Sequence, residues 1–221
     1  MSGLAPTRVG TEDDYVETTP ALTALVLVGS LKSSPEPSSS EVLGRQLLAE
    51  LARHGVTGGV VRLADHDIKP GVEMDMGDGD AWPAIRERIL AADILVVATP
   101  IGMGQPSSVT KRALERLDAE LSETDDEGRL LTFGHVAVVA VVGTEDGAHH
   151  TSAEVFQALN DVGFTLPAGA VTYWVGEAMG KVDFKDLEET PEKVATTTAT
   201  VAANAAHLAR LLRSTPYPAA G

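Results

Sequence analysis

The sequence predicts an α/β protein built on a doubly wound parallel sheet of five strands with helices on both faces. Two observations predict this fold class. Runs of Val, Ile and Leu recur along the chain without polar alternation, as expected of strands buried on both faces. Segments with apolar residues three or four positions apart lie between these runs, as in amphipathic helices. Right-handed crossovers convert such an alternating order into a doubly wound sheet.

The predicted strands are short and hydrophobic. Three of them are strong runs, and the second and fifth are weaker. They cover residues 22–28 (LTALVLV), 60–63 (VVRL), 94–98 (ILVVA), 136–142 (VAVVAVV) and 170–174 (AVTYW).

The predicted helices follow each strand. Their apolar positions are Leu43, Leu47 and Leu51; Ile85 and Ile89; Leu114, Leu117 and Leu121; Val155, Leu159 and Val162; and Val201, Leu208, Leu211 and Leu212. Start signals support them: residues 38–41 and 151–154 match a capping box, Asp80 is the expected cap of the second helix, and Pro191 is expected at the first position of a helix over 191–213.

The chain is expected to form one domain over residues 21–213, because there is no internal repeat and no second set of elements. Residues 1–20 are expected to be a flexible N-terminal segment, and residues 214–221 a C-terminal tail. The first segment is polar and acidic without an apolar centre, unlike a secretory signal.

Composition excludes several functional classes. The formal net charge is −15, and such an anionic surface repels the phosphates of nucleic acids. There is no cysteine, which excludes disulfides, thiolate metal sites and cysteine nucleophiles. No apolar run is long enough to span a membrane. We therefore expect a cytoplasmic protein with neither nucleic acid nor membrane as a partner.

Three loops at the carboxyl ends of predicted strands are the candidate binding region, since ligands of open parallel sheets bind there. The first loop, residues 29–41 (GSLKSSPEPSSSE), combines hydroxyls, the cation Lys32 and a helix N-terminus. Those groups favour a phosphate site, although Ser38 is also the expected helix cap. Neither the G-x-G-x-x-G nor the G-x-x-x-x-G-K-[ST] pattern is present.

The second and third loops carry different groups. Residues 99–111 (TPIGMGQPSSVTK) contain glycines that allow a flat ring to lie against the backbone. Residues 143–154 (GTEDGAHHTSAE) are consistent with two chemistries: a metal site made by Glu145, Asp146 and His149, or one wall of a cofactor site. We favour the second, because the other histidines form no second half of a metal site.

Together the three loops resemble those of the flavodoxin-like NAD(P)H-dependent FMN reductase/oxidoreductase family, over about residues 22–180. The first resembles the hydroxyl-rich FMN phosphate loop. The segment ATPIGMGQPSSVTKRALERLD is similar to the isoalloxazine loop and its following helix, and the segment from Gly143 to the fifth strand is similar to the third flavin-facing loop. The resemblance implies a flavodoxin-like fold.

The resemblance also implies the site residues. The phosphate is expected at Ser30, Lys32, Ser38, Ser39 and Ser40; the ring along Pro100, Ile101, Gly102, Met103 and Gly104; and the opposite side at Thr144, Glu145, Asp146 and Gly147. His149 is the candidate catalytic proton donor, and no metal is expected. Gly102 stands where the family often has an aromatic residue, which either weakens FMN binding or enlarges the substrate pocket.

The implied function is an FMN-dependent oxidoreductase that uses NADH or NADPH and a small acceptor such as a quinone, a flavin or another aromatic molecule. A homodimer or homotetramer is expected. Three alternatives remain open at this point: a flavodoxin-type electron carrier, a metal-dependent hydrolase using Glu145, Asp146 and His149, and a scaffold of this fold with weakened FMN binding.

Overall fold

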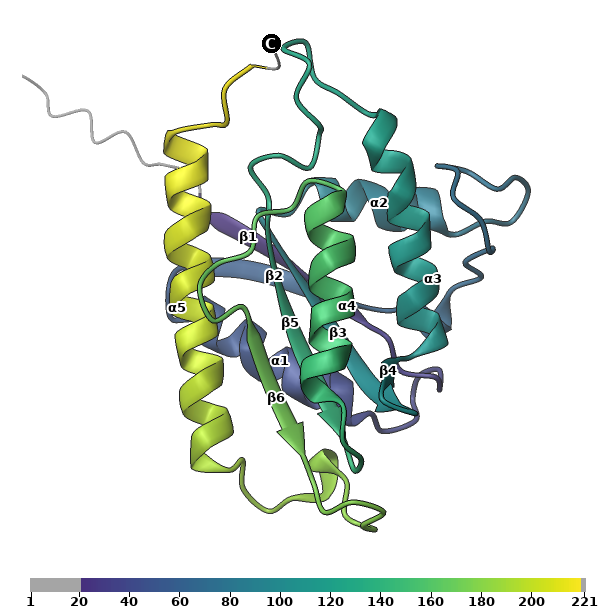
Figure 1. Cartoon of the computed structure of the whole chain (residues 1–221), viewed down its shortest axis with the longest axis vertical. Coiled ribbons are helices and arrows are strands. Elements are labelled where there is room, and N and C mark those ends of the chain that lie inside the picture. The colour runs from purple at the N-terminus through teal and green to yellow at the C-terminus, as the bar shows by residue number, and fades with distance from the viewer. Residues whose placement is uncertain (1–20, 220–221) are drawn as a thin grey trace, which may run out of the picture.

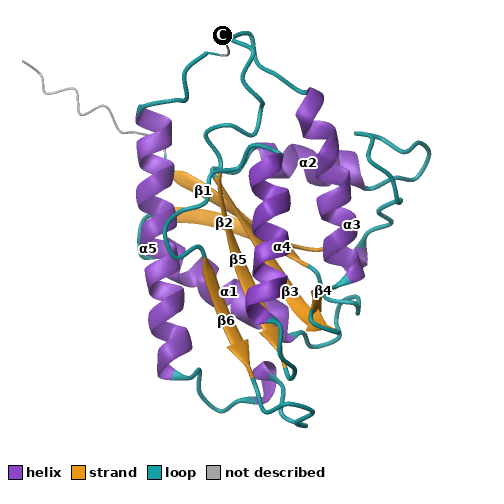
Figure 2. Cartoon of the chain, viewed as in Figure 1, coloured by secondary structure: helices purple, strands orange, loops and turns teal. Residues whose placement is uncertain are grey.

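The computed structural model describes residues 21–219 and contains the predicted parallel sheet between two layers of helices (Figure 2). The strand order β2-β1-β3-β5-β6 reverses direction between β1 and β3, which is the doubly wound arrangement. The parallel strands are β1 (Leu22–Val28), β2 (Val56–Arg62), β3 (Ile94–Gly102), β5 (Val136–Gly143) and β6 (Val171–Val175), and the short β4 (Gln105–Pro106) pairs antiparallel with β3.

The helices are α1 (Ser39–Ala52), α2 (Trp82–Leu90), α3 (Ser108–Arg116), α4 (Ala148–Asp161) and α5 (Glu192–Ser214) (Figure 1). None of the helices in residues 21–219 is long and apolar enough to cross a membrane. The proposed flexible segment, residues 1–20, lies outside the described residues. Part of the expected tail is described, and Tyr217 packs its ring 5.3 Å from that of Phe133 and accepts a hydrogen bond from Arg129 at its carbonyl.

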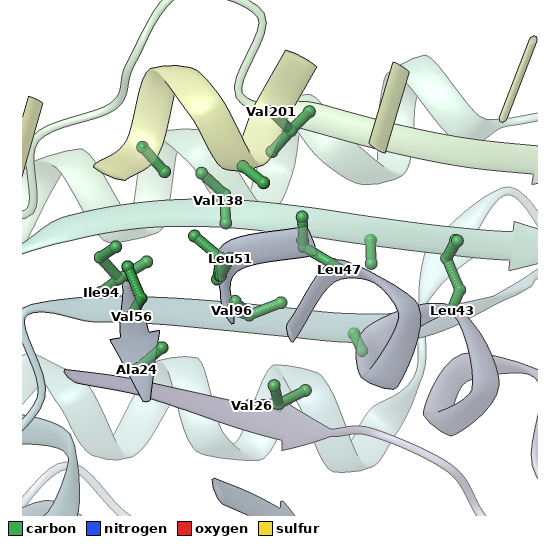
Figure 3. Close-up of a cluster of buried hydrophobic side chains, with 14 of the residues drawn as sticks. Ala24, Val26, Leu43, Leu47, Leu51, Val56, Ile94, Val96, Val138 and Val201 are labelled. Atoms are coloured by element: carbon green, nitrogen blue, oxygen red, sulfur yellow. The ribbon is translucent and has the colours of Figure 1, made fainter. Parts of the chain in front are cut away.

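Two hydrophobic clusters lie on opposite faces of the sheet. On one face, α1 and α5 cover residues such as Val26, Val96 and Val138, and Leu47 of α1 points into this cluster (Figure 3). On the other face, α2, α3 and α4 cover the alternate strand residues. Each central strand is therefore buried on both sides, as its apolar sequence without polar alternation predicts.

The last helix packs differently from its prediction. Val201 is buried, but Leu211 is about half exposed. Leu208 and Leu212 are partly buried and pack against the core, and alanines add fully buried positions that were not predicted, including Ala202, Ala205 and Ala209. Small side chains allow α5 to lie close to the sheet, and leucine spacing alone does not detect such a face.

The helix start signals were right in one case and wrong in others. Ser38 caps α1 and accepts a hydrogen bond from the Glu41 amide. The capping box over 151–154 is wrong, because α4 begins at Ala148 after Gly147, whose φ of 119° ends the loop earlier. Pro191 precedes rather than starts its helix. The cap of α2 is Ala81 rather than Asp80, although the Asp80 carboxylate accepts a hydrogen bond from the Trp82 amide at 3.2 Å.

Asp80 also forms a buried ion pair with Arg116 of α3, with 2.7 Å between Oδ2 and Nη1. The Arg116 guanidinium also donates to the carbonyls of Lys69, Glu73 and Met74, and so holds the long loop before α2 against the helix layer. Burial alone raises the pKa of Asp80, but hydrogen bonds from backbone amides and from Arg116 outweigh it and lower that pKa to about 2.

Replacing Asp80 by Asn is expected to lower the free energy of unfolding by about 3–5 kcal/mol, since it leaves Arg116 buried without its partner. Because the carboxyl pKa is lower in the folded chain, the ion pair stabilises fully above about pH 4 and is lost as the pH falls toward about 2. Urea unfolding at neutral pH and across this window tests both effects. Asp78→Asn, at an exposed position, is the control; equal behaviour of the two variants would contradict the prediction.

Candidate functional site

A cleft of about 290 Å³ opens at the carboxyl ends of β1, β3, β5 and β6, the edge where the sequence predicted a ligand. It receives residues from the first loop, from the end of β3 and from the end of β5. A larger cavity of about 710 Å³ lies at the opposite end of the sheet, lined by Leu22, Gly55 and the end of α5. That cavity contains none of the predicted site residues.

The first loop forms the polar side of the cleft. It ends at the N-terminus of α1, where Ser38, Ser39 and Ser40 line the opening. The first amides of an α-helix have no partner within the helix, and they bear partial positive charge. Hydroxyls, amides and the Lys32 side chain therefore converge on one small volume.

A buried arginine holds this loop in place through hydrogen bonds. Arg62, the last residue of β2, donates to the carbonyl of Glu36 at 2.6 Å and to the hydroxyl of Ser30 at 3.1 Å. Its guanidinium also lies 3.5 Å from the Glu41 carboxylate. Farther along the loop, the Ser34 amide and hydroxyl both donate to Asp65, and these bonds lower the pKa of that carboxyl. The loop is thus held at its start through Ser30 and in its middle through Ser34 and Glu36.

Buried hydroxyls join the ends of β1 and β3 to the start of α3. Ser107, which caps α3, donates to the carbonyl of Gly29 at 2.6 Å, and its amide donates to Thr99 at 3.2 Å. Thr110 lies 3.0 Å from both Ser107 and Thr99, measured between hydroxyl oxygens. A Cβ on Gly29 would lie 1.8 Å from the Thr110 hydroxyl oxygen, so this close packing requires glycine.

The second loop is more ordered than the sequence predicted. Residues 99–102 continue β3, where Pro100 pairs with Val142, and Gly102 pairs with Gln105 of β4. The tip, Met103, has a φ of 52° and an almost fully exposed side chain. Its amide donates to the Glu145 carboxylate at 3.0 Å, which joins the second loop to the third.

The third loop packs closely on the second. A Cβ on Gly147 would lie 2.7 Å from the Cα of Gly104, so glycine permits this contact. Asp146 accepts a hydrogen bond from the Gly147 amide, and His149 lies 3.3 Å from the hydroxyl of Tyr173. Glu145, Asp146 and His149 thus face different partners. Among residues 21–219, no group of three or more potential ligands is placed to hold a metal ion.

The structure brings most, though not all, of the predicted site residues together. Eight line the cleft: Ser30, Lys32, Ser38, Ser39, Ser40, Pro100, Ile101 and Thr144. Six others lie on the two interacting loops without lining it: Gly102, Met103, Gly104, Glu145, Asp146 and Gly147. His149, the candidate proton donor, lies beyond the cleft beside Tyr173.

Sequence reasoning missed the fourth wall of the cleft. Trp174 of β6 and the turn Phe184–Asp186 close this side, and the Trp174 and Phe184 ring centroids are 5.6 Å apart. The only available signal was that the fifth strand also ends at this edge of the sheet. Lys185 adds a second cation, and the carboxylates of Asp183 and Asp186 raise its pKa.

Comparison with known proteins agrees with this geometry. A family model described as NADPH-dependent FMN reductase matches residues 22–180, which contain all three loops. The chain belongs to this family. It is therefore an enzyme of an FMN-dependent oxidoreductase family with the flavodoxin-like fold, as the resemblance predicted.

The relatives of this FMN reductase family member carry different names. The 8-demethyl-8-aminoriboflavin-5′-phosphate synthase of Streptomyces davaonensis is 34% identical over 210 residues, covering 89% of this chain and 80% of the relative. The divalent metal cation transporter MntH of Mycobacterium bovis is 38% identical over 161 residues, 71% of this chain, but the match spans only 24% of the transporter.

Solved structures give the same result for the fold. RosB, in complex with the intermediate 8-demethyl-8-formylriboflavin-5′-phosphate, has a TM-score of 0.81 and 32% identity, and the match covers 89% of this chain and 82% of RosB. The apo NADH:FMN oxidoreductase EMOB has a TM-score of 0.61 and 20% identity, with 88% and 92% of the two chains covered.

Gly29→Ala is expected to lower the free energy of unfolding by about 1–3 kcal/mol, because the methyl group must displace Thr110 from the hydroxyl cluster. Thermal unfolding tests this. Gly102→Ala is the matched control, since a Cβ there meets no atom within 4 Å. A control that unfolds at the same lowered temperature as Gly29→Ala would show that the hydroxyl cluster does not matter.

Proposed function

We propose that the protein is an FMN-dependent oxidoreductase that passes hydride and electrons from NADH or NADPH through bound FMN to a small acceptor. One observation supports this proposal most directly. The three loop segments of the family meet around one cleft, at the edge of the sheet where the strand order reverses. The family match supports the cofactor, while the reductant and the acceptor are our inference.

The polar end of the cleft fits the phosphate of FMN. Ser39 and Ser40 lie in the first turn of α1, where amides and hydroxyls are donors for an anion. Lys32 contributes a cation at the same opening. Arg62 holds Ser30 and the loop carbonyl of Glu36, so the donors are arranged before any ligand arrives.

The part of the cleft proposed to hold the flavin ring is formed mainly by backbone. Pro100 and Ile101 line the cleft, and Gly102 continues the same strand without a side chain. Thr144 borders the opposite side. When bound, FMN supplies the redox chemistry by accepting hydride and passing electrons on. The residues of this chain hold and orient it and limit access of water.

Exposed apolar side chains around the site are suited to binding the acceptor. Met103 and Met179 are almost fully exposed, and Leu31 beside the cleft is about two-thirds exposed. Apolar side chains favour a flat aromatic acceptor such as a quinone, a flavin or a related molecule. His149 does not line the cleft, so we propose it as the proton donor for an acceptor that extends beyond the cleft toward Tyr173.

We also propose a homodimer or homotetramer, because an exposed apolar rim can be completed by a second copy. Size-exclusion chromatography with light scattering is expected to give at least twice the chain mass of 23.1 kDa. A single chain mass would contradict this proposal without affecting the cofactor site.

A second candidate function is modification of a phosphorylated flavin as a substrate. The specific observation in its favour is that the Streptomyces davaonensis relative, named as an aminoriboflavin phosphate synthase, matches 89% of this chain. Both candidate functions use the same phosphate-binding residues. They differ in whether the flavin leaves the site with its mass unchanged.

The purified protein is expected to retain flavin absorption bands after loading with FMN and desalting, and then to oxidise NADPH or NADH when a quinone is added. Mass spectrometry of the released flavin separates the two candidate functions, since a changed mass favours the second. Flavin retention without nicotinamide oxidation would favour an electron carrier. Failure to retain flavin after loading would contradict tightly bound FMN and leave either a protein that binds flavin only transiently or a scaffold.

A further inference from the structure

We propose that Lys185 contacts the phosphate of the bound flavin and makes the site prefer a phosphorylated flavin to an unphosphorylated one. This inference rests on the proposed FMN site and adds a specificity-determining residue to it. Lys185 lies after β6, outside residues 22–180 that the family model matches. The family match therefore assigns no role to Lys185.

The position of Lys185 is fixed by the fold. Its backbone amide donates to the Ser39 hydroxyl at 3.2 Å, which connects it to the first turn of α1. The preceding residue, Phe184, is buried and packs against Trp174. Lys185 thus stands on an anchored turn and lines the same cleft as Ser38 and Ser40.

The ammonium group of Lys185 is paired with two carboxylates. Its Nζ lies 2.6 Å from Asp183 Oδ2 and 2.8 Å from Asp186 Oδ2, and these carboxylates raise its pKa. The lysine side chain is 23% exposed, whereas the two aspartate side chains are 52% and 53% exposed. Because both carboxylates are more exposed than the lysine, we infer that they turn toward water when an anion binds, which frees the ammonium for that anion.

The chemistry of the ligand then produces selectivity. A flavin phosphate presents charged oxygens that an ammonium binds by charge-assisted hydrogen bonds. An unphosphorylated flavin presents a neutral hydroxyl there, which gains much less from the cation. Asp183 also lines the cleft, and Asp186 is the second carboxylate on Lys185. Both negative charges oppose the phosphate, so the ammonium must exchange these carboxylates for the phosphate oxygens.

The test is equilibrium binding of FMN and of riboflavin, followed by quenching of flavin fluorescence. Lys185→Gln is expected to weaken FMN binding by about tenfold and riboflavin binding by less than about twofold. Asp183→Asn is expected to do the opposite, strengthening FMN binding with little effect on riboflavin. Lys181→Gln, at an exposed lysine four residues away, controls for the change in net charge.

The double variant Asp183→Asn/Lys185→Gln distinguishes two explanations for weaker FMN binding by Lys185→Gln. Either Lys185 contacts the phosphate directly, or it only neutralises Asp183, whose charge would otherwise repel the phosphate. Direct contact predicts that it binds FMN more weakly than Asp183→Asn alone, and equal binding would overturn the proposal. An unchanged preference for FMN over riboflavin in Lys185→Gln would also overturn it, while leaving the proposed function intact. If the wild-type protein binds no FMN, the proposed function and this inference both fail.

Discussion

The hydroxyl cluster of Thr99, Ser107 and Thr110 is the contact on which the site depends. It joins the carboxyl ends of β1 and β3, where the sheet order reverses, to the N-terminus of α3. The first loop departs from β1 at Gly29, and the second continues from β3. The spacing between these two loops is therefore set by three short polar side chains and by the absence of a side chain at Gly29.

Two buried arginines likewise hold loops in place in this acidic protein. Arg62 holds the first loop through Ser30 and Glu36, and Arg116 holds the loop before α2 through Asp80 and backbone carbonyls. Guanidinium groups present several donors in a fixed plane, so one side chain can satisfy several acceptors of an irregular segment. With these loops held in place, Lys32 and Lys185 are the cations that line the cleft.

The fold could be predicted from the sequence because the central strands are apolar runs rich in Val, Ile and Leu without regular polar alternation. The prediction for β2 was too short because Gly58 and Gly59 weaken the strand signal. In the structure Gly58 allows close approach, since a Cβ there would lie 2.2 Å from the Ala24 carbonyl oxygen. The loops of the site were likewise predictable, because they follow these strands. Lys185 was not, because its contact with Ser39 joins residues 146 positions apart.

Titration of the ¹⁵N-labelled protein with FMN, followed by amide chemical shifts, tests the central claim most directly. We predict that the largest shifts fall on Ser39, Ser40, Lys185 and the Gly102–Gly104 loop, at the carboxyl edge of the sheet. Shifts concentrated instead around Gly55, Arg210 and Leu211 would place the ligand in the larger cavity at the opposite end. That result would contradict the account of the site given by the three loops.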